Sequence, residues 1–288
     1  MRVLLLGAGG QVGRAVAATV PRRHEVIAKT RAELDIADER TVQTLLAEAK
    51  PDWIVNAAAY TAVDLAEDQP AQATAINDTA VGTLANGAAG AGSRLLHLST
   101  DFVFDGRSGR AYKPGDAPQP LSVYGASKLG GETQVLQSGA DGIVLRTAWV
   151  YAAAGRNFVL TMLRLMRERD EVRVVGDQIG APTWATGLAR AIWALLDAGA
   201  PAGIYHWTDL GVASWYDFAV AIQEEALARG LLSKAACIVP ISSAEYPTRA
   251  RRPAFSVLDT SSSRALVTAP AAHWRHNLRM MLDELRAA

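Results

Sequence analysis

Three residues near the middle of the sequence have the types and spacing needed to transfer a proton to or from an oxygen atom. Tyr124 and Lys128 lie four residues apart in a helical pattern, so their side chains share one face of a helix. A lysine ammonium beside a phenol lowers the pKa of that phenol toward neutral pH. Thr100 ends an apolar run, where its hydroxyl is placed to bind a substrate oxygen. A buried tyrosine and a solvated lysine would explain the pair alone equally well.

A glycine turn close to the N-terminus predicts what lies beside these residues. The turn follows an apolar run and precedes a helical pattern, and it comprises Gly7, Gly10, Gln11, Val12 and Gly13. Its glycines allow a tight turn, close approach of a pyrophosphate, and close packing of helix on strand. The helix N-terminus adds positive potential for phosphates. We therefore expect a dinucleotide whose nicotinamide ribose contacts Lys128. The alternative is a turn needed only for packing.

The second apolar run bears on which dinucleotide binds. An acid usually follows this strand when the adenosine ribose is unmodified, but here Lys29 and Arg31 stand in its place. Either cation would suit a 2′-phosphate, so we expect NADPH, with NADH still possible; solvated cations are the alternative. Asp35 and Ile36, slightly downstream, are expected to border the adenine.

Alternating apolar runs and helical patterns must position these residues. Five runs predict buried strands: Val3–Leu6, Glu25–Ala28, Trp53–Asn56, Arg94–Ser99 and Ile143–Thr147. Helices are expected over Gly10–Val20, Asp38–Lys50, Gln69–Ala91 and Ser122–Gln137, with Asp38 as an N-cap and Pro51 as a stop. This order predicts an α/β fold, a doubly wound, Rossmann-like parallel sheet.

The second half of the chain predicts a smaller lobe over the carboxyl edge of the sheet. Helices are expected over Asn157–Arg169, Trp184–Ala198, from Ser214 to about Arg229, and from about Ala271; strands over Val172–Val175, Gly203–His206 and Cys237–Val239. We assign residues 1–150, joined by about 184–206, to dinucleotide binding. Residues 151–183 and 207–288 are assigned mainly to the substrate lobe.

Composition narrows the class of protein. The 288 residues carry no formal net charge, which favours neither nucleic acid nor an anionic membrane as a partner. Neither a signal peptide nor a membrane span is expected, so the prediction is cytoplasmic. The single cysteine, Cys237, is expected to be buried and inert. The histidines show no zinc spacing, and His273 and His276 are expected at the surface, so no metal is predicted.

Longer motifs then point to a family. The chain resembles the extended short-chain dehydrogenase/reductase superfamily and, more narrowly, the dTDP-4-dehydrorhamnose reductases within it. The matching stretches are Leu6–Gly13, Leu34–Ile36, Pro51–Asp64, Ser99–Gly106, Tyr124–Leu129, Arg146–Tyr151, Asp177–Thr183 and Pro247–Pro253. The last two are specific to this family and its close relatives.

The resemblance implies that a nucleotide sugar is reduced at C4, with dTDP-4-dehydro-β-L-rhamnose becoming dTDP-β-L-rhamnose. It implies that Tyr124 donates the proton, Lys128 holds the ribose and Thr100 orients the sugar oxygen. Implied substrate contacts are Thr100, Asp101, Tyr124, Trp149 and Val63; implied cofactor contacts are Gly10, Gln11, Val12, Asp35, Ile36, Ala59, Tyr60 and Thr61. Phe102 departs from the tyrosine often found there. Arg14 and Ala15 lack the acid that bridges magnesium in some dimers, so a monomer or a metal-free homodimer is expected.

Several alternatives remain open on the sequence. Trp149 either contacts the sugar or closes a core. Arg252, with Arg249 and Arg251, either pairs with the substrate diphosphate or is solvated. The acidic cluster Asp64, Glu67 and Asp68 is expected to be solvated. Another nucleotide-sugar reductase or epimerase, or a non-catalytic NADP-binding regulatory subunit, would share the glycine turn and the Tyr124–Lys128 pair.

Overall fold

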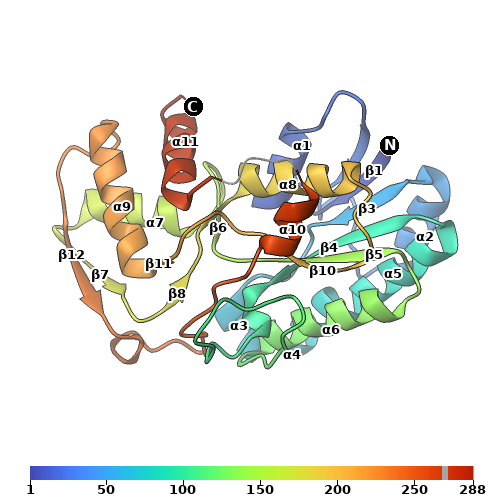
Figure 1. Cartoon of the computed structure of the whole chain (residues 1–288), viewed down its shortest axis with the longest axis horizontal. Coiled ribbons are helices and arrows are strands. Elements are labelled where there is room, and N and C mark those ends of the chain that lie inside the picture. Colours follow the sequence, from blue (N-terminus) through green and yellow to red (C-terminus); the bar gives the residue numbers. More distant parts are fainter. Residues whose placement is uncertain (268–271, 288) are drawn as a thin grey trace.

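A computed structural model describes residues 1–267 and 272–287. Its centre is a six-stranded parallel sheet in the order β10-β5-β4-β3-β1-β2, seen on the right of Figure 1. The strands are β1 (Arg2–Leu6), β2 (Glu25–Lys29), β3 (Trp53–Asn56), β4 (Arg94–Thr100), β5 (Gly142–Thr147) and β10 (Gly203–His206). All six predicted segments are confirmed, including the return of 203–206 to the sheet. The predicted doubly wound sheet is therefore confirmed as well.

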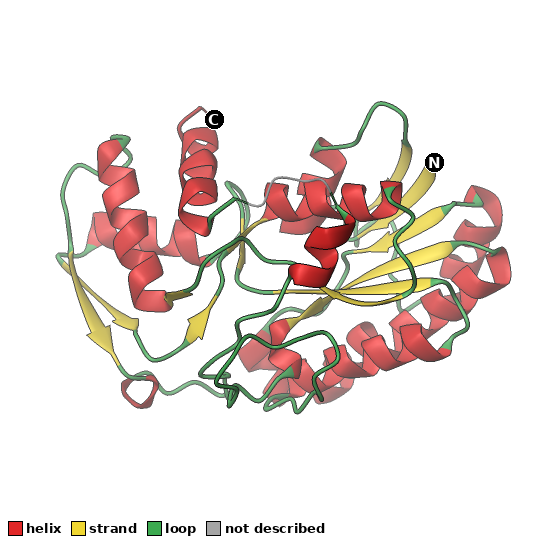
Figure 2. Ribbon diagram, in the orientation of Figure 1, coloured by secondary structure: helices red, strands yellow, loops and turns green. Residues whose placement is uncertain are grey.

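Helices cover both faces of the sheet (Figure 2). One face packs against α1 (Gln11–Ala18) and α8 (Ala185–Asp197), and the other against α2 (Glu39–Ala49), α5 (Ala80–Ala91) and α6 (Val123–Gln137). Successive residues of a strand pack into the cores on opposite faces of the sheet. In β1, Val3 and Leu5 pack on the side of α1 and α8, and Leu4 and Leu6 pack on the side of the other three helices. Asp38 caps α2 as predicted, since its carboxylate accepts from the Thr41 amide.

The helix predicted over Gln69–Ala91 is wrong in detail. The structure divides the region into α3 (Val63–Asp68), α4 (Pro70–Thr74), a π-helical turn η1 (Ala75–Thr79) and then α5. Asn77, buried in that turn, accepts a hydrogen bond from the Tyr60 amide and donates to the Tyr60 carbonyl and to the Ser127 hydroxyl. These contacts tie the turn to the loop after β3 and to α6, and a π turn at such a place is frequent near functional sites.

The remaining elements form a smaller lobe, on the left of Figure 1. It contains α7 (Phe158–Glu168), α9 (Trp215–Ala228) and α11 (Trp274–Ala287) around one apolar core, with β7 (Glu171–Val175) paired to β12 (Cys237–Ile241). Short pairings join β6 (Val150–Tyr151) to β9 (Thr183–Trp184) and β8 (Ile179–Gly180) to β11 (Ala213–Ser214). Ser214 caps α9 as predicted. The start predicted for the last helix near Ala271 lies outside the described residues.

Cys237 is exposed, so the prediction of a buried thiol is wrong. It is the first residue of β12, opposite the exposed Glu171, and the strand turns inward only toward Ile241. Its neighbours in the apolar run do reach the core of the smaller lobe, since Ala236 is part of that core and Ile238 packs against it. No helix in the described residues is long and apolar enough to cross a membrane.

Candidate active site

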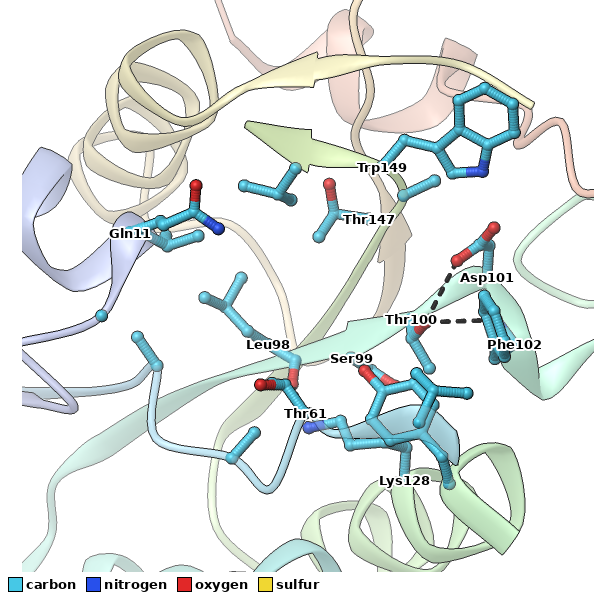
Figure 3. Close-up of a pocket in the computed structure, with 18 of the residues that line it drawn as sticks. Gln11, Thr61, Leu98, Ser99, Thr100, Asp101, Phe102, Lys128, Thr147 and Trp149 are labelled. Carbon is cyan, nitrogen blue, oxygen red and sulfur yellow. Dashed lines mark hydrogen bonds between the residues drawn. The ribbon is translucent and has the colours of Figure 1, made fainter. Parts of the chain in front are cut away.

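A cavity of about 410 Å³ lies at the carboxyl edge of the sheet, where the ends of β3, β4 and β5 meet the smaller lobe (Figure 3). This edge is where open parallel sheets bind their ligands. Among the residues lining the cavity are Gly10, Gln11, Val12, Ala59, Thr61, Val63, Thr100, Asp101, Tyr124, Lys128 and Trp149, all of which the sequence had predicted for the site. The structure thus brings the glycine turn and the Tyr124–Lys128 pair to one cavity.

The glycine turn is as tightly packed as its spacing predicts. Gly7 has a φ of 76°, and a Cβ there would lie 2.5 Å from the Ala58 amide nitrogen. A Cβ on Gly13 would lie 2.1 Å from the Gly7 carbonyl oxygen, which would force α1 away from β1. Gly10 is the N-cap of α1 and has no side chain between the helix N-terminus and the cavity. The positive end of α1 is therefore open to a phosphate.

A second cavity of about 200 Å³ lies on the other side of the turn. It shares Gly10, Ala57 and Ala59 with the first cavity, so a long ligand can extend from one to the other. Arg31, Asp35 and Ile36 line it, as expected for residues around an adenosine. Lys29 is not among the described residues that line it. Of the two predicted cations, Arg31 is therefore the better placed for a 2′-phosphate.

Tyr124 lies in the first turn of α6, which Ser122 caps by accepting from the Gly125 amide. Burial raises the pKa of Tyr124 to about 12, the Thr100 hydroxyl lowers it, and the charge of Asp101 raises it further. The pKa of the phenol is thus raised in this structure and not lowered as the sequence predicted, because burial is the largest effect. A phenol with a raised pKa stays protonated at neutral pH, so Tyr124 is present in the form that can donate a proton.

Lys128 is only 2% exposed, and its Nζ contacts two residues of β4. Its Nζ donates to the Leu98 carbonyl at 2.6 Å and lies 3.2 Å from His97 Nε2. Burial lowers the pKa of Lys128 to about 8, and the charge of Glu132, one turn further along α6, opposes this. Lys128 also lines the cavity, so it contacts both the sheet and the site.

Thr100 and Asp101 line the cavity beside Phe102 (Figure 3). Thr100 caps the short 3₁₀ turn η2 (Asp101–Val103): its hydroxyl accepts from the Phe102 amide and donates to Asp101 Oδ1 at 3.1 Å. Burial raises the pKa of Asp101 to about 6. The Phe102 ring packs edge-on against the Tyr124 ring, with centroids 5.6 Å apart, so this position buttresses the phenol through packing alone.

Trp149 lies between the two lobes. Its ring stacks on that of Trp215 with centroids 3.5 Å apart, and a Cβ on Gly180 would clash with it. Its φ of 49° is unusual for a large residue, and such backbone conformations cluster at functional sites. Both indoles line the cavity. Trp215 was missed by the sequence, because a tryptophan just after an N-cap carries no local signal of a site.

Thr147 was also missed. It ends β5 beside Thr100, its hydroxyl oxygen is buried without a hydrogen-bond partner among the described residues, and it lines the cavity (Figure 3). Its place at the carboxyl end of a strand was the available signal. Tyr60, in contrast, is predicted for the cofactor but lies outside the described lining of both cavities, and its hydroxyl donates to Gln69.

A third cavity, of about 790 Å³, adjoins the first along Trp215 and includes Arg252 and Gln178. Arg252 is half-buried and pairs with Asp64 at 2.7 Å, and Arg249 pairs with Asp68. Glu67 accepts from the Val123 amide at the start of α6. The acidic cluster is partly solvated as predicted, since the side chains of Asp64 and Asp68 are 43% and 44% exposed. The sequence did not predict that its members also pair with Arg249 and Arg252 of the smaller lobe and with the start of the helix that carries Tyr124.

In the described residues no group of three or more His, Cys, Asp or Glu side chains could hold a metal ion. His273 and His276 are exposed, as predicted.

Comparison with known proteins agrees with this geometry. A family model described as the RmlD substrate binding domain matches residues 1–287. A dTDP-4-dehydrorhamnose reductase of Burkholderia thailandensis is 41% identical, over 99% of both chains. A solved reductase of that name from Clostridium acetobutylicum superposes with a TM-score of 0.93 at 36% identity, covering 99% of this chain and 100% of the other. One from Bacillus anthracis, solved in complex with NADP, superposes with a TM-score of 0.92 at 32% identity, covering 98% and 99%. The chain therefore belongs to the dTDP-4-dehydrorhamnose reductase family.

Proposed function

We propose that this chain reduces the C4 ketone of dTDP-4-dehydro-β-L-rhamnose to dTDP-β-L-rhamnose, with hydride from NADPH and a proton from Tyr124. The observation that carries the proposal is the cavity that unites the glycine turn with Thr100, Tyr124 and Lys128. Family membership supports the substrate, and the protonated state of the buried phenol supports the direction of proton transfer.

The residues of the chain fit a dinucleotide along the two adjoining cavities. Gly7, Gly10, Gln11, Val12 and Gly13 would receive the pyrophosphate at the N-terminus of α1. Asp35 and Ile36 would border the adenine, and Arg31, with Lys29 behind it, would bind a 2′-phosphate. Ala59, Tyr60 and Thr61 would follow the dinucleotide along the loop after β3. NADPH, when bound, supplies the hydride that reduces C4.

Three residues would carry out the proton transfer and stabilise its products. Thr100 would hydrogen-bond the oxygen on C4 and hold it toward Tyr124. Tyr124 would give its phenolic proton to that oxygen as the carbon gains hydride, so that the ketone becomes an alcohol and the tyrosine a phenolate. Lys128, as an ammonium, would stabilise that phenolate and hold the ribose hydroxyls.

The sugar would lie against Asp101, Val63 and Trp149. Arg252 would reach the diphosphate, and to do so it would exchange Asp64 for phosphate oxygens, which a guanidinium binds bidentately. In this arrangement residues 1–150 and about 184–206 bind the cofactor, while 151–183 and 207–288 mainly bind the substrate. We further propose a cytoplasmic enzyme that works as a monomer or homodimer.

The test is NADPH oxidation, followed by the fall in absorbance, against a panel of 4-keto-6-deoxy nucleotide sugars. One NADPH should be consumed per sugar reduced, with the dTDP-rhamnose precursor preferred. Turnover of sugar nucleotide without net NADPH loss would indicate an epimerase instead. Tyr124→Phe should lower turnover by roughly 10²–10⁴-fold while NADPH still binds. Full turnover in that variant would refute the role of Tyr124, and NADPH binding without turnover of any sugar by the wild-type protein would indicate a regulatory subunit.

A further inference from the structure

A chain of buried polar groups lies behind Lys128, on the side away from the cavity. It runs from Asn56 on β3, through His97 on β4, to Lys128 on α6, and these residues are 0%, 0% and 2% exposed. Asn56 and His97 are register partners, with Asn56 Nδ2 3.1 Å from His97 Nδ1. His97 Nε2 lies 3.2 Å from Lys128 Nζ. His97 is thus a direct neighbour of Lys128 without lining the cavity.

The orientation of the Asn56 amide determines which atom faces His97. The amide N–H of Ala58 donates to Asn56 Oδ1 at 3.1 Å. The other end of the side-chain amide, which faces the imidazole, is therefore the NH₂ group, and an NH₂ group only donates. His97 Nδ1 must consequently accept, so it carries no proton.

A neutral imidazole then carries its proton on Nε2, which faces Lys128. Burial lowers the pKa of His97 well below its ordinary value, and a charge on Lys128 lowers it further, so the ring is neutral at physiological pH whichever form Lys128 takes. An ammonium group has three donors and no acceptor, whereas a neutral amine has one lone pair. The His97 Nε2–H can hydrogen-bond Nζ only when Lys128 is the amine, which still donates to the Leu98 carbonyl.

We infer that His97 is a positioning residue that holds Lys128 as a neutral amine against β4, and that protonation of Lys128 breaks this hydrogen bond and turns the ammonium toward the cavity. The inference rests on the proposed function for the role of Lys128 in the reaction. It means that the charge and the position of Lys128 change together, and that Asn56 sets both through the tautomer of His97.

The other charged groups around this chain do not provide a competing acceptor for Nζ. Glu132, also on α6, is engaged by Arg146 of β5 and by the Ser99 hydroxyl, both of them buried. On the cavity side stand Tyr124, a neutral phenol, and Asp101, whose Oδ1 accepts from Thr100. A protonated Lys128 keeps the Leu98 carbonyl as one acceptor, and the phenol oxygen and bound ligands on the cavity side are the acceptors for its other N–H groups.

Reversing the His97 tautomer tests the inference. In Asn56→Asp, the carboxylate oxygen that replaces the NH₂ group faces His97 Nδ1. The other carboxylate oxygen still accepts from the Ala58 amide. His97 then carries its proton on Nδ1, and Nε2 becomes an acceptor for the Lys128 ammonium. We expect the midpoint of the Lys128 titration to rise by about one pH unit or more. The new carboxylate also attracts the Lys128 ammonium directly. The control is therefore Asn56→Asp in a His97→Leu background, where the rise in the Lys128 midpoint should be less than half of that seen with His97 present.

Lysine NMR with label at Cε measures this titration without any assay of activity. The chain has five lysines; Lys128 is the buried one, and Lys128→Arg assigns its signal. Histidine ¹⁵N NMR of the wild-type protein should show the His97 proton on Nε2. A proton on Nδ1, or an equal rise with and without His97, would overturn the inference. If His97→Leu does not fold, the inference is tested by the tautomer of His97 in the wild-type protein and by the Lys128 midpoint in the Asn56→Asp single variant.

The pH profile of turnover links the inference to the reaction. The alkaline limb of kcat should move upward in Asn56→Asp by the same amount as the NMR titration. If the wild-type protein reduces no nucleotide sugar, the proposed function fails while the NMR result still stands on its own. If the protein is an active reductase but the two midpoints move independently, the link between His97 and the reaction is refuted.

Discussion

Asp101 should make the fold less stable at neutral pH, and Asp101→Asn should therefore stabilise it. The side chain is 2% exposed, and burial raises its pKa from 3.8 to about 6, against the effects of hydrogen bonds from Ser256 and Thr100. At 1.36 kcal/mol for each pH unit, this rise corresponds to about 3 kcal/mol of lost stability once the group is ionised. The asparagine amide keeps an oxygen to accept from Thr100, so most of this free energy should be recovered.

The sign of the pH dependence follows from linkage. Below about pH 4, Asp101 is protonated in both the folded and the unfolded chain and contributes no difference. Between about pH 4 and 6 the unfolded chain loses its proton first, so the free energy of unfolding falls as the pH rises. Above about pH 6 both states are ionised and the loss stays constant. The advantage of Asp101→Asn should therefore grow from near zero at pH 4 to its full value at pH 7.5.

Urea unfolding of wild type and variant at pH 4 and pH 7.5 measures this difference. Asp105→Asn is the matched control, because the amide of Arg107 and the hydroxyl of Tyr112 lower the pKa of Asp105, and its loss should cost stability above about pH 4. The two substitutions should thus have opposite signs at pH 7.5. If Asp101→Asn destabilises the protein equally at both pH values, burial of an ionised Asp101 is not the dominant effect.

Three further perturbations test the rest of the structure. Arg31→Ala should weaken NADPH binding by roughly ten- to a hundredfold, the value of a charge-assisted hydrogen bond, and leave NADH binding nearly unchanged; titration calorimetry measures both, and equal weakening would exclude a 2′-phosphate contact. Gly13→Ala should weaken binding of both dinucleotides, because its Cβ would meet a backbone oxygen of the turn, whereas Gly90→Ala, with no atom within 4 Å of its Cβ, should bind them normally in the same assay. Arg146→Met should cost about 3–5 kcal/mol in urea unfolding, because Glu132 would stay buried without its charge partner, and adding Glu132→Leu should restore most of the loss. A single variant as stable as wild type would contradict that account.

Local spacing in the chain was sufficient to predict the fold and the residues at the centre of the site. Period and length placed the sheet strands, and the Gly7–Gly13 turn and the Tyr124–Lys128 spacing depend on residues within one turn or one helix. The carboxyl-edge rule for parallel sheets then brought Thr100 to the same place. Such features are set by nearest neighbours along the chain, so they can be read without knowing the packing.

Only the tertiary structure decided the burial and the contacts that depend on residues distant in the sequence. The exposure of Cys237 depends on how β12 pairs with β7, and the pairing of Arg252 with Asp64 joins residues 188 positions apart. Trp215 reaches the cavity only because the smaller lobe stacks it on Trp149. The spacing of Tyr124 and Lys128 predicted that they share a helix face, but burial against β4 and the tautomer of His97 determine where the Lys128 amine points. Burial and hydrogen-bond partners come from packing, and no periodicity in the sequence records them.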